Sequence, residues 1–100
     1  MIDPGLIEKR RIVLNNGGTV SIQASEFHYC IPRNDIGPYS HVEVGFPRDC
    51  VISNEMLAFA EDSDRPEHTV YAYTPVAVVK KFIEDNGGIK EGQLLPMEEK

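Results

Sequence analysis

Two short stretches near the N-terminus have the residue pattern of β-strands, and a turn sequence separates them. Residues 11–14 are rich in β-forming residues, and residues 19–25 alternate polar and apolar side chains, which places Val20, Ile22 and Ala24 on one face. The sequence NNGG at 15–18 supplies residues that tolerate positive φ, as a tight hairpin turn requires. The pattern predicts an antiparallel β-hairpin over residues 10–25.

A second alternating stretch covers residues 40–47. Val42, Val44 and Phe46 would share one face of a strand, with the polar residues between them on the other face. Gly45 interrupts the run, and a glycine inside a strand is typical of a bulge or of a close backbone approach. We therefore expect a third strand here.

Two helices follow, and a short strand over residues 69–73 lies between them. The first is predicted from 54 to about 61, because Ser53 has the position of an N-cap and Ile52 and Leu57 have the spacing of a hydrophobic staple. The second is predicted over 75–86.

The second predicted helix is the more clearly amphipathic. Thr74 is its expected N-cap, with Pro75 at the first helical position, where a missing N–H costs nothing. Tyr73 and Val78 form an expected staple pair. The expected buried stripe is Val78, Val79, Phe82 and Ile83. The expected solvent face is Lys80, Lys81, Glu84 and Asp85.

The element order β-β-β-α-β-α predicts an α+β fold. We expect a mainly antiparallel sheet of about four strands with two helices packed on one face. Residues 1–9 read as an N-terminal arm, residues 10–89 as a single α+β domain and residues 90–100 as a C-terminal tail. The expected core is Val20, Ile22, Val42, Val44, Phe46, Leu57, Val70, Val79, Phe82 and Ile83.

The composition is that of a small globular protein. The chain has 100 residues, of which 41% are apolar, and no apolar run approaches the roughly 20 residues that a membrane helix needs. The N-terminus lacks a basic region followed by an apolar run, so we expect no signal peptide and a cytoplasmic protein without membrane contact. Cys30 and Cys50 are then expected as free thiols.

The negative charge lies mainly in the second half. The net charge is −6; residues 1–50 carry five basic against six acidic side chains, net −1, and residues 51–100 carry five against ten, net −5. Direct nucleic-acid binding is disfavoured, because it requires a basic face. An acidic protein is compatible with a basic, nucleic-acid-binding surface on a protein partner.

The long loop between the second and third strands, residues 25–39, is the candidate site. It is aromatic, and Pro32 and Pro38 would stiffen it and reduce the entropy lost on binding. Tyrosine and arginine are common at interface hot spots, and the acidic stretch 61–67, with Glu61, Asp62, Asp64 and Glu67, would steer the protein toward a basic partner. The expected partner-binding residues are Phe27, His28, Tyr29, Arg33, Asn34, Asp35, Tyr39, Glu61, Asp62 and Asp64.

An alternative is a small Cys/His-dependent enzyme or metal-binding protein. His28 and Cys30 would project to the same side of an extended segment, and His41 could join them as a base or ligand. The chain has no C-x-x-C motif, and zinc would need further ligands. We therefore prefer a non-enzymatic protein without a cofactor.

The segments 28–33 (HYCIPR), 37–39 (GPY) and 42–47 (VEVGFP), with 69–75 and 86–88, resemble small proteins of bacteriophages and prophages. The resemblance extends over residues 10–89 and implies neither an activity nor catalytic residues. It implies a context, because small acidic phage proteins often bind and block a host protein, including CRISPR defence complexes. The resulting hypothesis is a binding module that occupies a site on a host protein, with a homodimer through an exposed β-edge as a further option.

Overall fold

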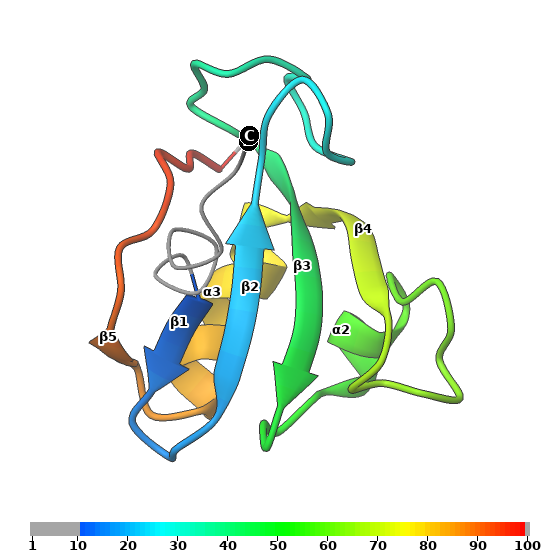
Figure 1. The fold of residues 1–100 in the computed structure, drawn as a ribbon, viewed down its shortest axis with the longest axis vertical. Coiled ribbons are helices and arrows are strands. Elements are labelled where there is room, and N and C mark those ends of the chain that lie inside the picture. Colours follow the sequence, from blue (N-terminus) through cyan, green and yellow to red (C-terminus); the bar gives the residue numbers. More distant parts are fainter. Residues whose placement is uncertain (1–10, 100) are drawn as a thin grey trace, which may run out of the picture.

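The structure, a computed structural model, describes residues 11–99 as a five-stranded antiparallel sheet with two helices (Figure 1). The strand order is β4-β3-β2-β1-β5, and all neighbours are antiparallel. The predicted α+β class is confirmed, and the number of strands is corrected from about four to five. The expected arm, residues 1–9, lies outside the described residues. The elements are β1 (Arg11–Leu14), β2 (Thr19–Gln23), β3 (His41–Arg48), α2 (Asn54–Leu57), β4 (Val70–Pro75), α3 (Val76–Asp85) and β5 (Ile89–Glu91).

The β1–β2 hairpin forms as predicted. Arg11 lies opposite Ser21, and the Leu14 N–H donates to the Gly18 carbonyl at 2.8 Å to close the turn. Gly17 has a φ of 91°, which glycine adopts without strain. Local sequence therefore accounts for this part of the sheet.

The fifth strand lies in the stretch that was expected to begin the C-terminal tail. Gly87 and Gly88, both with a φ of 88°, turn the chain at the end of α3, and the Asn15 N–H donates to the Gly88 carbonyl at 2.9 Å. This contact brings residues 89–91 alongside β1, with which they pair antiparallel. Three residues are too few to show alternation, so only the pairing with β1 defines the strand.

Two β-bulges change which side chains face the core. In β3 the bulge follows Gly45 and contains Phe46, which has a φ of 49° and is 48% exposed. In β4 the bulge lies between Tyr71 and Thr74 and contains Tyr73, which has a φ of 50° and is 40% exposed. An extra residue in a strand reverses the inward and outward positions beyond it. Phe46 was therefore wrongly predicted as a core residue.

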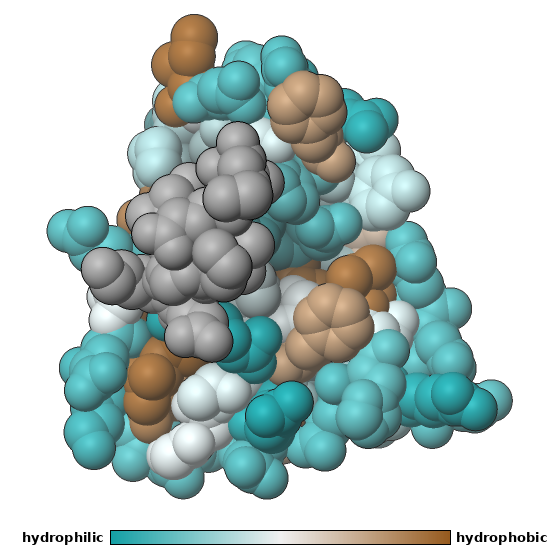
Figure 2. Space-filling view, viewed as in Figure 1, coloured by the Kyte–Doolittle hydropathy of each residue, from teal (hydrophilic) through white to brown (hydrophobic). Residues whose placement is uncertain are grey.

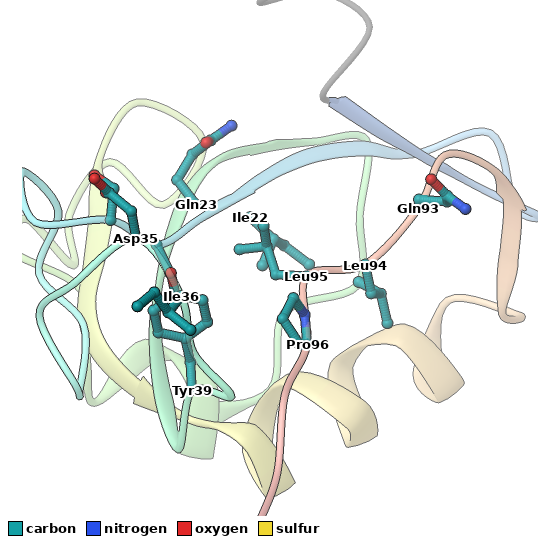
Figure 3. Close-up of a pocket in the computed structure, with 11 residues that line it drawn as sticks. Ile22, Gln23, Asp35, Ile36, Tyr39, Gln93, Leu94, Leu95 and Pro96 are labelled. Carbon is teal, nitrogen blue, oxygen red and sulfur yellow. The ribbon is translucent and has the colours of Figure 1, made fainter.

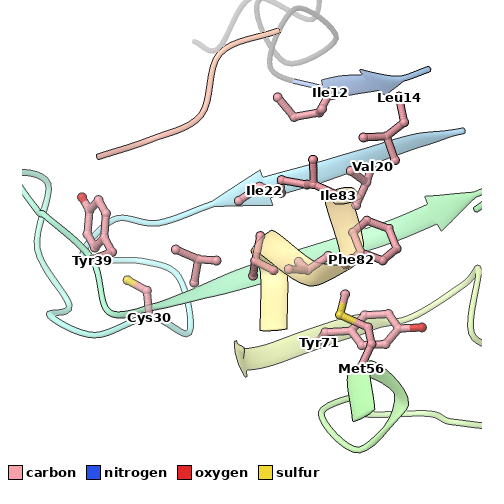
Figure 4. Packing of buried hydrophobic residues seen from close by; sticks show 13 residues of the cluster. Ile12, Leu14, Val20, Ile22, Cys30, Tyr39, Met56, Tyr71, Phe82 and Ile83 are labelled. Carbon is pink, nitrogen blue, oxygen red and sulfur yellow. The ribbon is translucent and has the colours of Figure 1, made fainter. Parts of the chain in front are cut away.

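The core lies between the sheet and the helices, and α3 crosses behind the sheet in the view of Figure 1. Figure 4 shows side chains of β1, β2 and α3 meeting with Met56 of α2 and Tyr71 of β4. Leu57 and Val70 are only half-buried, which corrects two more core predictions. Buried as predicted are Val20, Ile22, Val42, Val44, Val79, Phe82 and Ile83; buried without having been predicted are Ile12, Leu14, Cys30, Tyr39, Met56, Tyr71 and Val76.

Tyr71, rather than Val70, is the inward residue of β4. Its hydroxyl donates to the Pro66 carbonyl at 2.8 Å, so the polar end of the buried ring has a partner. Burial raises the pKa of Tyr71 to about 12, because the phenolate would lose its hydration.

The first helix is shorter than predicted. Ser53 caps α2 as expected and accepts the Met56 N–H at 3.2 Å. The helix ends at Leu57, however, and not near residue 61. The following residues pair with β4 instead: Ala60 lies opposite Tyr71, and the Glu61 N–H donates to the Val70 carbonyl. Hydrogen bonds to a strand that comes later in the sequence thus end the helix.

The second helix has the predicted amphipathic faces but a different start. Thr74 was expected as its N-cap; instead it is a buried residue of β4, and its hydroxyl donates to the Tyr71 carbonyl at 3.0 Å. Pro75 takes the cap position. Val76 replaces Val78 on the buried side of the helix. Tyr73 is exposed, so it does not form the predicted staple with Val78. The four charged residues of the expected solvent face are exposed.

Candidate functional site

The loop between β2 and β3 is closely tied to the body by its own hydrogen bonds. The Asn34 side-chain oxygen accepts the N–H groups of Ile36 and Gly37, each at 3.0 Å. The Tyr39 hydroxyl donates to the Asn34 carbonyl at 2.8 Å, and the Tyr39 N–H donates to the Pro96 carbonyl at 2.8 Å. These hydrogen bonds give the loop a defined conformation between the sheet and the C-terminal segment (Figure 3).

Tyr39 belongs to the core. Its side chain is buried, and burial raises the pKa of its hydroxyl. This corrects the expectation that Tyr39 contacts a partner, because an enclosed ring cannot reach one. Asn34 is half-buried, and its hydrogen bonds position the loop.

His28 joins the beginning of the loop to β3. The Ser25 hydroxyl accepts the Phe27 N–H at 3.0 Å and lies 2.6 Å from the His28 Nδ1 atom. The other ring nitrogen, Nε2, lies 3.9 Å from a carboxylate oxygen of Glu43. Since the Ser25 oxygen already accepts one hydrogen bond, it can donate its proton to Nδ1, which leaves Nε2–H facing Glu43. His28 thus fixes the turn that precedes Tyr29.

Tyr29, Arg33 and Tyr73 form an exposed cluster beside this turn, which we call the tyrosine patch. The ring centroids of Tyr29 and Tyr73 are 5.8 Å apart, and the Arg33 guanidinium carbon lies 5.7 Å from the centre of the Tyr29 ring. The two tyrosines are 41% and 40% exposed. The Tyr73 N–H donates to the Tyr29 carbonyl at 3.1 Å, which fixes the loop to the end of β4.

Tyr73 is the residue of the tyrosine patch that sequence reasoning missed. It lies two positions after Tyr71, and a regular strand would put both rings on the same, buried face. The β4 bulge separates them and turns Tyr73 outward, next to Tyr29. The sequence holds no signal for this bulge, since Tyr73 is not a glycine.

The remaining loop residues of the expected site lie at its exposed tip. Arg33 Nε donates to the Glu26 carbonyl at 3.1 Å, and the Glu26 N–H donates to a carboxylate oxygen of Asp35 at 3.1 Å. Phe27 is 79% exposed. Within residues 11–99, its ring forms no aromatic pair with Tyr29 or Tyr73. Figure 2 shows that the visible face is largely polar, with apolar side chains in separate groups.

The acidic residues of the expected site lie at the other end of β4. Glu61, Asp62 and Asp64 are exposed, and the Asp62 carboxylate accepts the Asp64 N–H at 3.2 Å. The Asp62 N–H donates to the Thr69 hydroxyl at 3.0 Å, which holds the loop against the start of the strand. The structure thus brings Tyr29, Arg33 and Tyr73 together and leaves these carboxylates as a separate acidic region along the same strand.

Within residues 11–99, no hydrogen bond joins the side chains of the three residues of the Cys/His alternative to one another. Cys30 is buried, and its thiol donates to the Ser25 carbonyl at 3.1 Å. His41 Nδ1 lies 2.9 Å from the Ser40 hydroxyl, whereas His28 faces Ser25. Within residues 11–99, no three His, Cys, Asp or Glu side chains come close enough together to hold a metal ion.

Cys50 offers a test of thiol chemistry in this fold. Burial, and after it the nearby carboxylates of Glu67 and Asp49, raise the pKa of its thiol to about 11. An ordinary thiol has a pKa of about 8.5. Alkylation of Cys50, followed by peptide mass spectrometry from pH 7 to pH 11, should therefore stay slow through pH 9 and accelerate above it. Glu67→Gln should move the profile to lower pH; a plateau already below pH 9 would contradict the assignment.

The outer edge of β4 is occupied within the chain. The Ala72 N–H donates to the Phe59 carbonyl, the Glu61 N–H donates to the Val70 carbonyl, and Tyr73 bonds to the loop as described above. A homodimer by strand addition would therefore have to use the other edge of the sheet, at β5.

Comparison with known proteins adds no relative. No family model, no curated protein and no solved structure matches this chain. In the part of the chain that the structure describes, no helix has the length and apolar character needed to cross a membrane.

Proposed function

We propose that this protein is a protein-binding module that acts by occupying a site on its partner. The observation that supports the proposal is the tyrosine patch. Two half-exposed tyrosine rings and an arginine, drawn from the loop and from β4, form one contiguous contact. These residue types dominate the binding energy of protein interfaces.

The patch is organised before binding. Tyr29 is held by the backbone bond from Tyr73 and by the Ser25–His28 contact that precedes it. Arg33 is held by its Nε bond to the Glu26 carbonyl and by the contact of its guanidinium with the Tyr29 ring. Side chains that are already ordered lose little conformational entropy on binding, so more of the contact energy remains as affinity.

The charge distribution favours a basic partner. The protein has a net charge of −6, and Glu61, Asp62 and Asp64 lie at the start of the strand whose end carries Tyr73. Long-range attraction of this kind raises association rates more than affinity. Together with the resemblance to phage proteins, this suggests a basic or nucleic-acid-binding surface of a host protein, which the module would block sterically.

The patch can be tested with a matched pair of aromatic substitutions. After capture of the partner from host lysate with tagged protein, its affinity is measured with purified variants. Tyr29→Ala and Tyr73→Ala should each weaken binding by about 2 kcal/mol, roughly 30-fold. Arg33→Ala should weaken binding less than the two tyrosine substitutions, because water can replace part of the contacts that the Arg33 side chain makes. The melting temperature should change little, because these side chains are exposed.

Phe46→Ala is the control for Tyr73→Ala. Phe46 also occupies a β-bulge, has nearly the same positive φ and has a similar exposure. It should leave the affinity unchanged. If Phe46→Ala weakens binding as much as Tyr73→Ala, or if the partner binds the Tyr29 and Tyr73 variants normally, the patch is not the contact surface.

A further inference from the structure

Two asparagines of this chain are followed directly by glycine: Asn16 by Gly17, and Asn86 by Gly87. An asparagine in this position loses ammonia readily, because glycine has no side chain to hinder its backbone nitrogen when that atom attacks the asparagine side chain. The reaction accelerates as the pH rises, since the attacking nitrogen must lose its proton. The structure brings the two asparagines into contact and protects them unequally.

Asn86 is the protected member of the pair. It is 1% exposed; its side-chain oxygen accepts two hydrogen bonds and its side-chain nitrogen donates two. The attacking nitrogen is also held, because the Gly87 N–H donates to the Glu84 carbonyl at 3.0 Å at the end of α3. All of these bonds would have to break together, so a reaction at Asn86 requires unfolding of this part of the core.

Asn16 is exposed, in the turn between β1 and β2, at the end of the sheet opposite the 25–39 loop (Figure 1). Its side-chain nitrogen donates to the Asn86 Oδ1 atom at 2.6 Å, and its side-chain oxygen accepts the Gly18 N–H at 3.0 Å. A Cβ atom added at Gly17 would meet nothing within 4 Å beyond its chain neighbours. The two side-chain bonds, and not burial, therefore restrain Asn16.

A local opening is enough to release Asn16. Three further hydrogen bonds hold the turn against the end of α3. The Asn16 N–H donates to the Asn86 carbonyl at 3.3 Å and the Asn15 N–H to the Gly88 carbonyl at 2.9 Å. The Asn15 side-chain amide donates to the Gly87 carbonyl at 2.7 Å. Exposed bonds of this kind open at free energies far below that of global unfolding.

We propose that Asn16 is a deamidation site of the folded protein and that its contact with Asn86 sets the rate. The Gly17 backbone nitrogen loses its proton and forms a bond to the side-chain carbonyl carbon of Asn16. The side-chain nitrogen takes up a proton and leaves as ammonia. One water molecule then opens the resulting cyclic imide at either carbonyl, which gives aspartate or isoaspartate. This modification goes beyond the proposed function and does not depend on it.

The product cannot restore the contact. Aspartate at this position would place a carboxylate oxygen, which only accepts hydrogen bonds, against the Asn86 Oδ1 atom. That atom is itself an acceptor and already binds the Val51 N–H at 2.7 Å. Isoaspartate would also lengthen the backbone of the turn. The reaction therefore weakens, irreversibly, the junction between the hairpin turn and the end of α3.

The test follows deamidation by peptide mass spectrometry during incubation of the full chain at neutral and mildly alkaline pH. In the folded protein, Asn16 should react while Asn86 stays unmodified, and the rate should increase with pH. In urea, both asparagines should react at similar rates, because the unfolded chain protects neither. Asn86→Ala should accelerate the reaction of Asn16 about fivefold, the effect of one lost hydrogen bond on the opening equilibrium.

Phe82→Ala is the matched control for Asn86→Ala, because it lowers the free energy of unfolding at least as much but leaves the Asn86 side chain in place. Under conditions where circular dichroism shows both variants folded, it should change the rate at Asn16 by less than about twofold. Asn16→Asp reproduces one product and should lower the melting temperature by about 4–8 °C.

Four results would overturn the proposal. Asn16 stays unmodified in the folded protein while the chain in urea is converted; Asn86 reacts as fast as Asn16 in the folded protein; Phe82→Ala accelerates the reaction as much as Asn86→Ala; or Asn16→Asp leaves the melting temperature unchanged. The first two comparisons use the unaltered chain, so they decide the question even if a variant fails to fold.

Discussion

Replacing Phe82 with alanine should lower the free energy of unfolding by about 3–5 kcal/mol, the range found for phenylalanine truncation in protein cores. Phe82 is 2% exposed and lies on the face of α3 that meets the sheet (Figure 4). Its removal would leave a cavity between the helix and the strands, and the surrounding side chains could refill only part of it. Small domains have about 5–15 kcal/mol of stability in total, so the variant should be marginal.

Urea denaturation of the two proteins measures this effect. Phe27→Ala is the control, because Phe27 is 79% exposed and its truncation removes almost no buried surface. It should change the unfolding free energy by less than about 0.5 kcal/mol. A loss below about 1 kcal/mol for Phe82→Ala would show that the helix stripe is not the centre of the core.

Asn86→Ala should cost about 2–4 kcal/mol, because it removes the four hydrogen bonds of one buried side chain. Asn86 follows α3 and is buried. Its side-chain oxygen accepts the Val51 N–H at 2.7 Å and the Asn16 amide at 2.6 Å. Its nitrogen donates to the carbonyls of Val51 at 3.0 Å and Phe82 at 2.8 Å.

This one side chain therefore joins three distant parts of the chain: the hairpin turn, the segment before α2 and the end of α3. Asn15→Ala is a matched control, since the exposed Asn15 amide makes a single bond, to the Gly87 carbonyl at 2.7 Å. It should cost no more than about 1 kcal/mol. Equal losses for the two variants, measured by urea denaturation, would show that the Asn86 network adds nothing beyond one ordinary hydrogen bond.

The loop between β2 and β3 is anchored on two sides. The Tyr73 N–H bond to the Tyr29 carbonyl joins it to β4, and the Tyr39 N–H bond to the Pro96 carbonyl joins it to the C-terminal segment. Asn34 and Tyr39, inside the loop, fix its shape through their own hydrogen bonds.

Part of the site was open to prediction from composition. Tyr29 and Arg33 stood out because aromatic and arginine residues in a proline-containing loop are typical of interfaces. Tyr73 could not be found in this way, because its exposure depends on a bulge whose residues carry no glycine or proline signal.

The sequence by itself determined the elements whose stability is local. The turn residues at 15–18 specified the hairpin, the Ser53 hydroxyl specified the start of α2, and the spacing of Val79, Phe82 and Ile83 specified the buried side of α3. Tertiary structure decided the rest. The bulges at Phe46 and Tyr73, the early end of α2 and the pairing of β5 all depend on hydrogen bonds between segments far apart in the chain. Such bonds form only where the backbone groups of the two segments come into contact. The polar and apolar pattern within one segment does not determine which distant segment it will pair with.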